Sequence, residues 1–97
     1  MSKENLTFGD AVEALKKGER VARKAWKEDQ SYLWLLPAAN VKAEWCREPH
    51  LKKVAEDNGG EIEAHGSIRM MTADQKVLTG WTPSQLDVLV EDWEVLV

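Results

Sequence analysis

The spacing of apolar residues predicts a helix near the start of the chain. Apolar side chains recur three and four residues apart and share one helical face: Phe8, Ala11, Val12 and Leu15. Thr7 suits an N-cap, and Asp10 follows it three residues later, as in a capping box. Gly18 stands where helices commonly end. We therefore predict a helix over residues 8–17.

Two strands are predicted to follow this helix. Residues 19–26 alternate between apolar and polar, which indicates a strand that ends near Trp26 and carries Val21 and Arg23 on the same face. Residues 31–36 are apolar on both faces and stop at Pro37. Both apolar faces of such a strand must pack against other residues. We expect the first helix to cover one face and another subunit to cover the other.

The pattern is weakest over residues 38–64, which we interpret as a variable insert. Residues 40–47 suggest a short helix capped by Asn40. Pro49 suits the first position of a second helix, with an apolar stripe of Leu51, Val54 and Ala55. Residues 57–66 have the composition of a loop.

The C-terminal third predicts a hairpin, a helix and a final strand. Residues 67–81 fit two strands that turn at 73–75. Thr82 and Gln85 have the spacing of a capping box, with Pro83 at the first helical position. One apolar helical face would then hold Leu86, Leu89, Val90 and Trp93, and residues 92–97 would form a strand. The sequence thus predicts a single α+β domain, with helices packed on a mainly antiparallel sheet.

Charge and composition narrow the function classes. The net charge of 97 residues is −4, with no basic stripe, which argues against duplex nucleic acid as a partner but leaves a small anionic ligand open. The lone Cys46 makes no intrachain disulfide, and no apolar run could span a bilayer. We expect a soluble cytoplasmic protein with no membrane partner.

Few residues carry the signature of an enzyme. Cys46 and His50 are four residues apart, but Pro49 lies between them, and only His65 remains among the histidines. A zinc site needs more ligands than these, and no glycine-rich phosphate loop is present. We therefore expect no catalytic residue, no metal and no cofactor.

The five tryptophans are the main candidates for binding. Trp93 and Trp34 fit a core or a subunit interface, whereas Phe8, Trp26 and Trp81 stand at the ends of elements, where side chains line clefts. The carboxylates at 87, 91 and 92 are expected on a solvated helix face. Asp87 is the exception, because it lies close enough to the capping box to accept from a ribose hydroxyl or a base amino group.

Two stretches resemble the second Thoeris anti-defense family of phage and prophage proteins. They are LTFGDAVEALKKGERVARKAW near the start and IRMMTADQKVLTGWTPSQLDVLVEDWEVL near the end. They contain the patterns F-G-x-A-x-x-x-L-K-x-G-x-x-V-A-R-x-x-W and T-A-D…G-W-x-x-S-Q-x-D-x-L-x-E-D-W, in that order. Together these stretches cover about half of the chain, and the pair is more specific than either alone.

The resemblance implies a molecular sponge. Members of the family bind glycocyclic ADP-ribose, the signal made by a TIR-domain protein in Thoeris immunity, without cleaving it. The NAD-depleting effector is then never triggered. Members assemble as homo-oligomers, here expected as a tetramer, with pockets at subunit contacts. Some relatives also bind other cyclic oligonucleotides, so the identity of the ligand stays open.

A cyclic ADP-ribose offers an adenine face, ribose hydroxyls and a pyrophosphate. We assign Phe8, Trp26 and Trp81 as stacking walls and Arg23 as a phosphate partner. Ser84, Gln85 and Asp87 are the candidate polar contacts, although Gln85 is also a candidate for the helix cap. The alternatives are a Trp-rich module that docks a host or phage protein and, less favoured, a nucleotide hydrolase.

Overall fold

The computed structural model describes residues 3–97, which form two compact units. The first unit comprises the chain up to Leu36 together with Ser67–Val97, and the second comprises Pro37–Gly66. Each unit is described separately below.

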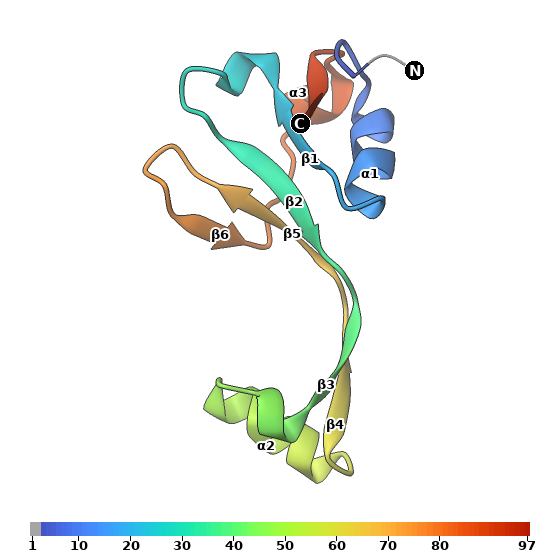
Figure 1. Cartoon of the computed structure of the whole chain (residues 1–97), viewed down its shortest axis with the longest axis vertical. Coiled ribbons are helices and arrows are strands. Elements are labelled where there is room, and N and C mark those ends of the chain that lie inside the picture. Colours follow the sequence, from blue (N-terminus) through green and yellow to red (C-terminus); the bar gives the residue numbers. More distant parts are fainter. Residues whose placement is uncertain (1–2) are drawn as a thin grey trace. The chain divides into compact units, whose positions relative to one another are not determined.

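A five-stranded antiparallel sheet forms the centre of the first unit, with strand order β6-β5-β2-β1-β7. Figure 1 shows α1 and α3 beside this sheet, and the arrangement confirms the predicted α+β class. The elements of the unit are α1 (Phe8–Lys16), β1 (Arg20–Arg23), the 3-10 turn η1 (Lys24–Trp26), β2 (Tyr32–Leu36), β5 (Ser67–Met71), β6 (Val77–Thr79), α3 (Gln85–Leu89) and β7 (Trp93–Leu96).

Helix α1 forms as its sequence predicts and covers one face of the sheet. The Thr7 hydroxyl accepts from the Asp10 amide and the Asp10 carboxylate accepts from the Thr7 amide, each at 3.1 Å. Gly18 follows the helix with a φ of 87°, a conformation that a residue without a Cβ adopts easily. The buried core that the helix and the sheet form together consists of Leu6, Ala11, Ala14, Leu15, Val21, Leu33 and Trp93.

Strand register separates this core from the second face of the sheet. Leu33 pairs with both Val21 and Met70, and these residues lie on the core side. Their sequence neighbours therefore point to the opposite face, because side chains alternate along a strand. That second face carries Ala22, Tyr32, Trp34, Arg69, Glu94 and Leu96. Its cover by another subunit stays a prediction.

The structure corrects three expectations in the first unit. Strand β1 ends at Arg23, because the Lys24 amide bonds to the Asp92 carbonyl and residues 24–26 turn. The capping box of α3 is Ser84 with Asp87, and not Thr82 with Gln85, so Pro83 precedes the cap. The predicted apolar face of α3 is also wrong, because the helix stops at Leu89 and leaves that side chain 75% exposed.

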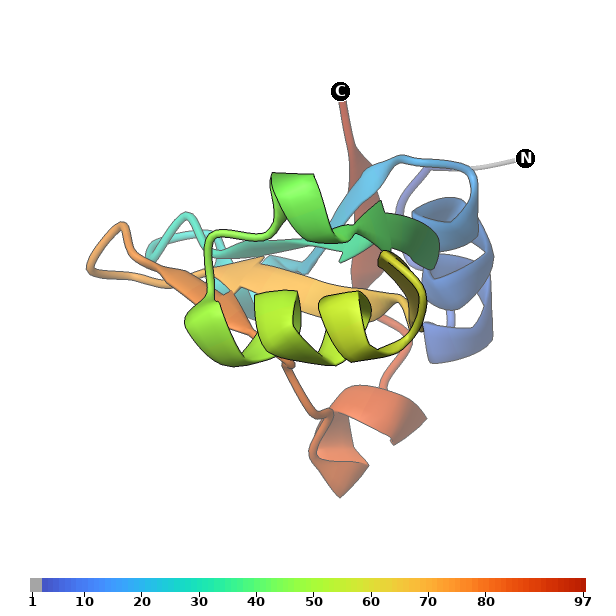
Figure 2. The same cartoon turned by 90° about the horizontal axis from the view of Figure 1, so that it is seen from below.

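The second unit is a two-stranded sheet with one helix. It contains β3 (Ala39–Lys42), the 3-10 turn η2 (Ala43–Trp45), α2 (Pro49–Asp57) and β4 (Glu61–Ala64). Helix α2, drawn yellow-green in Figure 2, begins at Pro49 as predicted. The short helix predicted at 40–47 is replaced by the end of β3 and the turn η2, and the loop predicted at 57–66 contains β4. Asn40 pairs with Glu63 across an antiparallel ladder, and this long-range pairing overrides the local signals.

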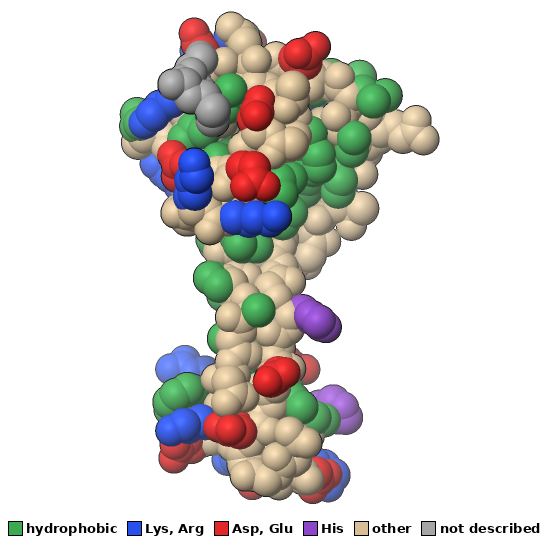
Figure 3. Space-filling model, turned by 90° about the vertical axis from the view of Figure 1, so that its right-hand side faces the viewer, with side chains coloured by type: hydrophobic (Ala, Val, Ile, Leu, Met, Phe, Trp, Pro, Cys, Tyr) green, Lys and Arg blue, Asp and Glu red, His purple; other side chains and the backbone are tan. Residues whose placement is uncertain are grey.

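Charged side chains of both signs are interspersed over the face shown in Figure 3. No helix among residues 3–97 is long and apolar enough to cross a membrane.

Candidate functional site

Three aromatic rings surround Trp93 and form a cluster with it. The Trp93 side chain is completely buried, and the rings of Phe8, Trp26 and Trp81 lie with centroids 5.6, 5.3 and 6.2 Å from it. Trp26 and Trp81 also meet each other at 6.0 Å, and all three tryptophan pairs are edge to face. Phe8, Trp26 and Trp81 are only partly buried. The structure therefore brings the three predicted aromatic residues together around one buried ring.

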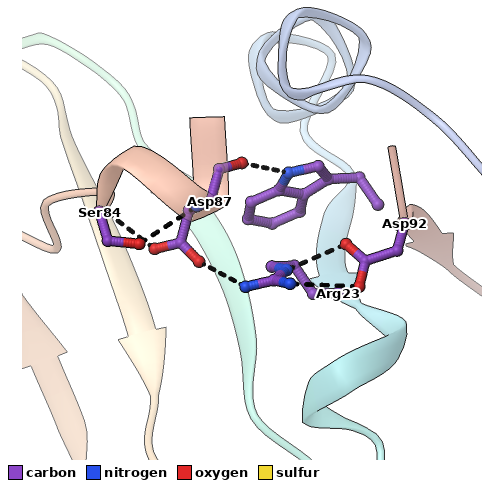
Figure 4. A network of polar contacts seen from close by, with 5 residues as sticks. Arg23, Ser84, Asp87 and Asp92 are labelled. Carbon is purple, nitrogen blue, oxygen red and sulfur yellow. Dashed lines mark hydrogen bonds and ion pairs between the residues drawn. The ribbon is translucent and has the colours of Figure 1, made fainter. Parts of the chain in front are cut away.

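A buried ion network lies beside this cluster (Figure 4). The Arg23 guanidinium donates from Nη1 to Asp87 at 2.8 Å and from Nε to Asp92 at 2.9 Å, with a longer contact from Nη2 to Asp92 at 3.4 Å. The Trp93 indole N–H donates to the Asp87 carbonyl at 2.8 Å. Strand β1, helix α3 and the start of β7 are thus tied together at one point.

The network shifts the pKa values of Arg23 and Asp87. The hydrogen bond to Asp92 raises the pKa of Arg23 against the opposing effect of burial, and Asp87 adds to the rise. Burial alone would raise the pKa of Asp87, but hydrogen bonds from Ser84 and Arg23 outweigh it and hold that pKa below its usual range. Both groups are therefore charged near neutral pH, as a buried pair that satisfies its hydrogen bonds can be.

Both carboxylate oxygens of Asp87 are occupied within the protein. Oδ1 accepts from Arg23 at 2.8 Å, and Oδ2 accepts from the Ser84 amide at 2.8 Å. Asp87 is also only 8% exposed. In this structure it fixes α3 to β1, whereas Ser84 and Gln85 at the start of the helix are exposed.

Four of the seven predicted site residues line one of two cavities, and Asp87 lines neither. Arg23 and Trp26 line a cavity of about 340 Å³ beside the 24–31 turn. Ser84 and Gln85 line a smaller one of about 220 Å³ that also includes Pro83, Val88 and Leu89. Phe8 and Trp81 belong to the aromatic cluster and line neither of these two.

Sequence reasoning missed two parts of this arrangement. Asp92 was expected on a solvated helix face, and Trp93 was expected on α3, yet Asp92 binds Arg23 and Trp93 opens β7. One signal was available, because the alternation of β1 places Arg23 on the same face as buried Val21. An arginine on a core face needs acidic partners, and the C-terminal segment is rich in them.

Within residues 3–97, no group of three or more histidine, cysteine, aspartate or glutamate side chains could hold a metal ion.

Comparison with known proteins assigns the family. The Thoeris anti-defense 2-like domain family matches residues 6–96. The chain is also 31% identical over 101 residues to a Bacillus phage SP01 protein named Thoeris anti-defense 2, an alignment that covers 97% of this chain and 98% of that protein. The match includes the second unit, residues 37–66, as well as the two stretches that carry the resemblance. This chain belongs to the Thoeris anti-defense 2-like family.

Proposed function

We propose that this protein counters Thoeris immunity by binding a cyclic nucleotide signal, glycocyclic ADP-ribose, and holding it without cleavage. The effector would then not be triggered. Membership of the Thoeris anti-defense 2-like family supports the anti-Thoeris role. The proposed place of action is the cytoplasm of the infected bacterium, and related cyclic oligonucleotides are further candidate ligands.

The aromatic cluster is the observation that carries the proposal of a ligand site. Trp26 and Trp81 meet Trp93 edge-on and remain partly exposed, so both rings are held in place with surface left over for a flat ligand. Because the rings are fixed before binding, the ligand loses less free energy in ordering them. Phe8 also contacts Trp93, with ring centroids 5.6 Å apart and the rings tilted at 53°.

Arg23 retains donors for an anion. A guanidinium has five N–H groups, and the contacts to Asp87 and Asp92 occupy three of them. Since Arg23 also lines the larger cavity beside Trp26, the remaining N–H groups are proposed to face the pyrophosphate. Ser84 and Gln85 are proposed to supply polar contacts from the start of α3.

Stacking on aromatic rings does not by itself supply the binding free energy that a sponge needs. A base stacked on an aromatic ring contributes about 1–3 kcal/mol, whereas nanomolar affinity requires about 12 kcal/mol. A single cavity of about 340 Å³ is also at the small end of ligand pockets. We therefore propose that the chain self-associates, as a tetramer, and that a second subunit completes the site. Leu86 and Leu89 on α3, 62% and 75% exposed, provide apolar surface for such a contact.

Calorimetric titration with glycocyclic ADP-ribose tests the proposal. We expect tight binding by the wild type and, for Trp81→Ala, an affinity about 5- to 100-fold weaker, because one stacking wall is lost. Trp45→Ala is the matched control, since Trp45 is 62% exposed in the second unit and should not affect the affinity. Size-exclusion chromatography separates the alternatives: if Trp81→Ala breaks the oligomer, Trp81 is an interface residue.

A second candidate function is a protein-docking module, and the exposure of Trp45 favours it. Tryptophan is enriched at protein interfaces, and Trp45 is 62% exposed, with Lys42 Nζ 5.1 Å from its ring centroid. A docking module should show no thermal shift with micromolar cyclic nucleotide, whereas a sponge should be stabilised by its ligand.

A further inference from the structure

The larger cavity has an aromatic and apolar floor that belongs to the second face of the sheet. Tyr32, Ala22 and Leu96 all lie on that face and line the cavity, whose volume is about 340 Å³. Trp26 forms a further wall, and its ring lies 6.0 Å from Trp81, so the cavity adjoins the aromatic cluster. The centroid of the Tyr32 ring lies 5.2 Å from the Arg20 guanidinium carbon and 5.6 Å from the centroid of the Trp34 ring.

Two glutamines from distant parts of the chain stand at the rim of this cavity. Gln30 ends the 24–31 turn, and Gln75 lies in the turn between β5 and β6. Both have a left-handed backbone, with φ values of 57° and 61°. Within residues 3–97, Asn5 is the only other residue besides glycine with this conformation.

Turn formation alone does not explain the choice of glutamine. Glycine or asparagine adopts positive φ more easily, so either would suit these positions better. The Gln30 and Gln75 backbone amides close their turns, but neither side-chain amide has a hydrogen-bond partner among residues 3–97. Unfavourable backbone conformations of this kind gather at functional sites. Two exposed residues whose primary amides have no partner among residues 3–97 thus line one cavity with an aromatic floor.

We infer that this cavity receives the purine ring of the bound nucleotide and that Gln30 and Gln75 read its edge. The inference rests on the proposed function and names residues that set its specificity. A primary amide pairs with adenine by donating to one ring nitrogen and accepting from the exocyclic amino group. Tyr32 and Trp26 supply ring faces for the base. Lys27, also at the rim, supplies a positive charge for a phosphate. The volume suits one base with its ribose, so the rest of the ligand extends toward Arg23 and Trp81.

The test uses Gln30→Met and Gln75→Met, which keep the length of the side chain and remove the amide. Calorimetric titration with glycocyclic ADP-ribose should show each variant weakened about 5- to 100-fold, the discrimination expected of a bidentate base contact. Lys76→Met is the control, because Lys76 lies in the same turn as Gln75, is 80% exposed and does not line the cavity. Wild-type affinity in both glutamine variants would overturn the inference and leave the proposed function intact.

If the wild type itself releases no heat on titration with glycocyclic ADP-ribose, that result refutes the proposed function. A second measurement then tests the purine pocket separately. Adenosine monophosphate is then titrated into ¹⁵N-labelled protein, and the side-chain amide resonances of glutamine are followed. Shifts of the Gln30 and Gln75 side-chain amides that exceed those of Gln85 would support the purine pocket. The absence of such shifts would overturn it.

Discussion

Removing the Asp87 carboxylate should destabilise the protein by about 3 kcal/mol. Asp87→Ala removes the capping-box hydrogen bond from the Ser84 amide, a loss of about 1 kcal/mol, and a charged hydrogen bond from buried Arg23, a loss of about 1.5–3 kcal/mol. Breaking a buried ion pair typically costs about 3–5 kcal/mol. Because Arg23 keeps Asp92 as a partner, we expect the lower end of that range.

The chain contains a matched control for this experiment. Asp10 occupies the same position in the capping box of α1, with the same reciprocal bonds to Thr7, but no arginine contacts it among residues 3–97. Asp10→Ala should therefore cost only about 1 kcal/mol. The difference of about 2 kcal/mol between the two variants isolates the contribution of Arg23.

Urea unfolding followed by tryptophan fluorescence measures the free energy of unfolding of both variants. One protein concentration is used throughout, because self-association would shift the apparent stability. Equal losses of stability in Asp87→Ala and Asp10→Ala would refute the reasoning, since the ion pair would then contribute nothing beyond the cap. A loss above about 5 kcal/mol would indicate that Asp92 does not compensate.

Three further predictions follow from burial and charge. Trp93→Ala should lower the free energy of unfolding by about 3–5 kcal/mol in urea titration, because the side chain is completely buried, and retained stability would contradict its place at the centre of the core. The stabilisation due to Asp87, measured as the difference between wild type and Asp87→Asn, should be complete above about pH 4 and fall as the pH drops through the lowered pKa of Asp87. The unfolded chain takes up its proton first, so loss of this difference at a higher pH would contradict the sign. Leu89→Gln should change monomer stability by less than about 0.5 kcal/mol but weaken self-association in analytical ultracentrifugation, and an unchanged oligomer would exclude α3 from the contact.

Sequence patterns were most informative where one local rule decided the structure. The Thr7–Asp10 box, the Gly18 stop and Pro49 at the start of α2 each act within one helical turn, and each is present as predicted. The hairpin over residues 67–81 likewise follows from two short apolar runs around a turn.

The errors arose where distant segments decide the outcome. Asn40 looks like a helix cap, but its strand pairs with Glu61–Ala64, which the pattern of residues 57–66 did not reveal. Two capping boxes overlap in residues 82–87, and the one that forms is the one whose acidic member also binds Arg23. That choice depends on a residue 64 positions away, so spacing alone could not make it.

The most direct test of the central claim is recovery of the ligand. Purified protein is saturated with glycocyclic ADP-ribose, freed of excess ligand and heated, and the released nucleotide is analysed by chromatography and mass spectrometry. A sponge predicts release of intact glycocyclic ADP-ribose in proportion to the protein. Release of a linear or hydrolysed product, or of no nucleotide at all, would contradict the account.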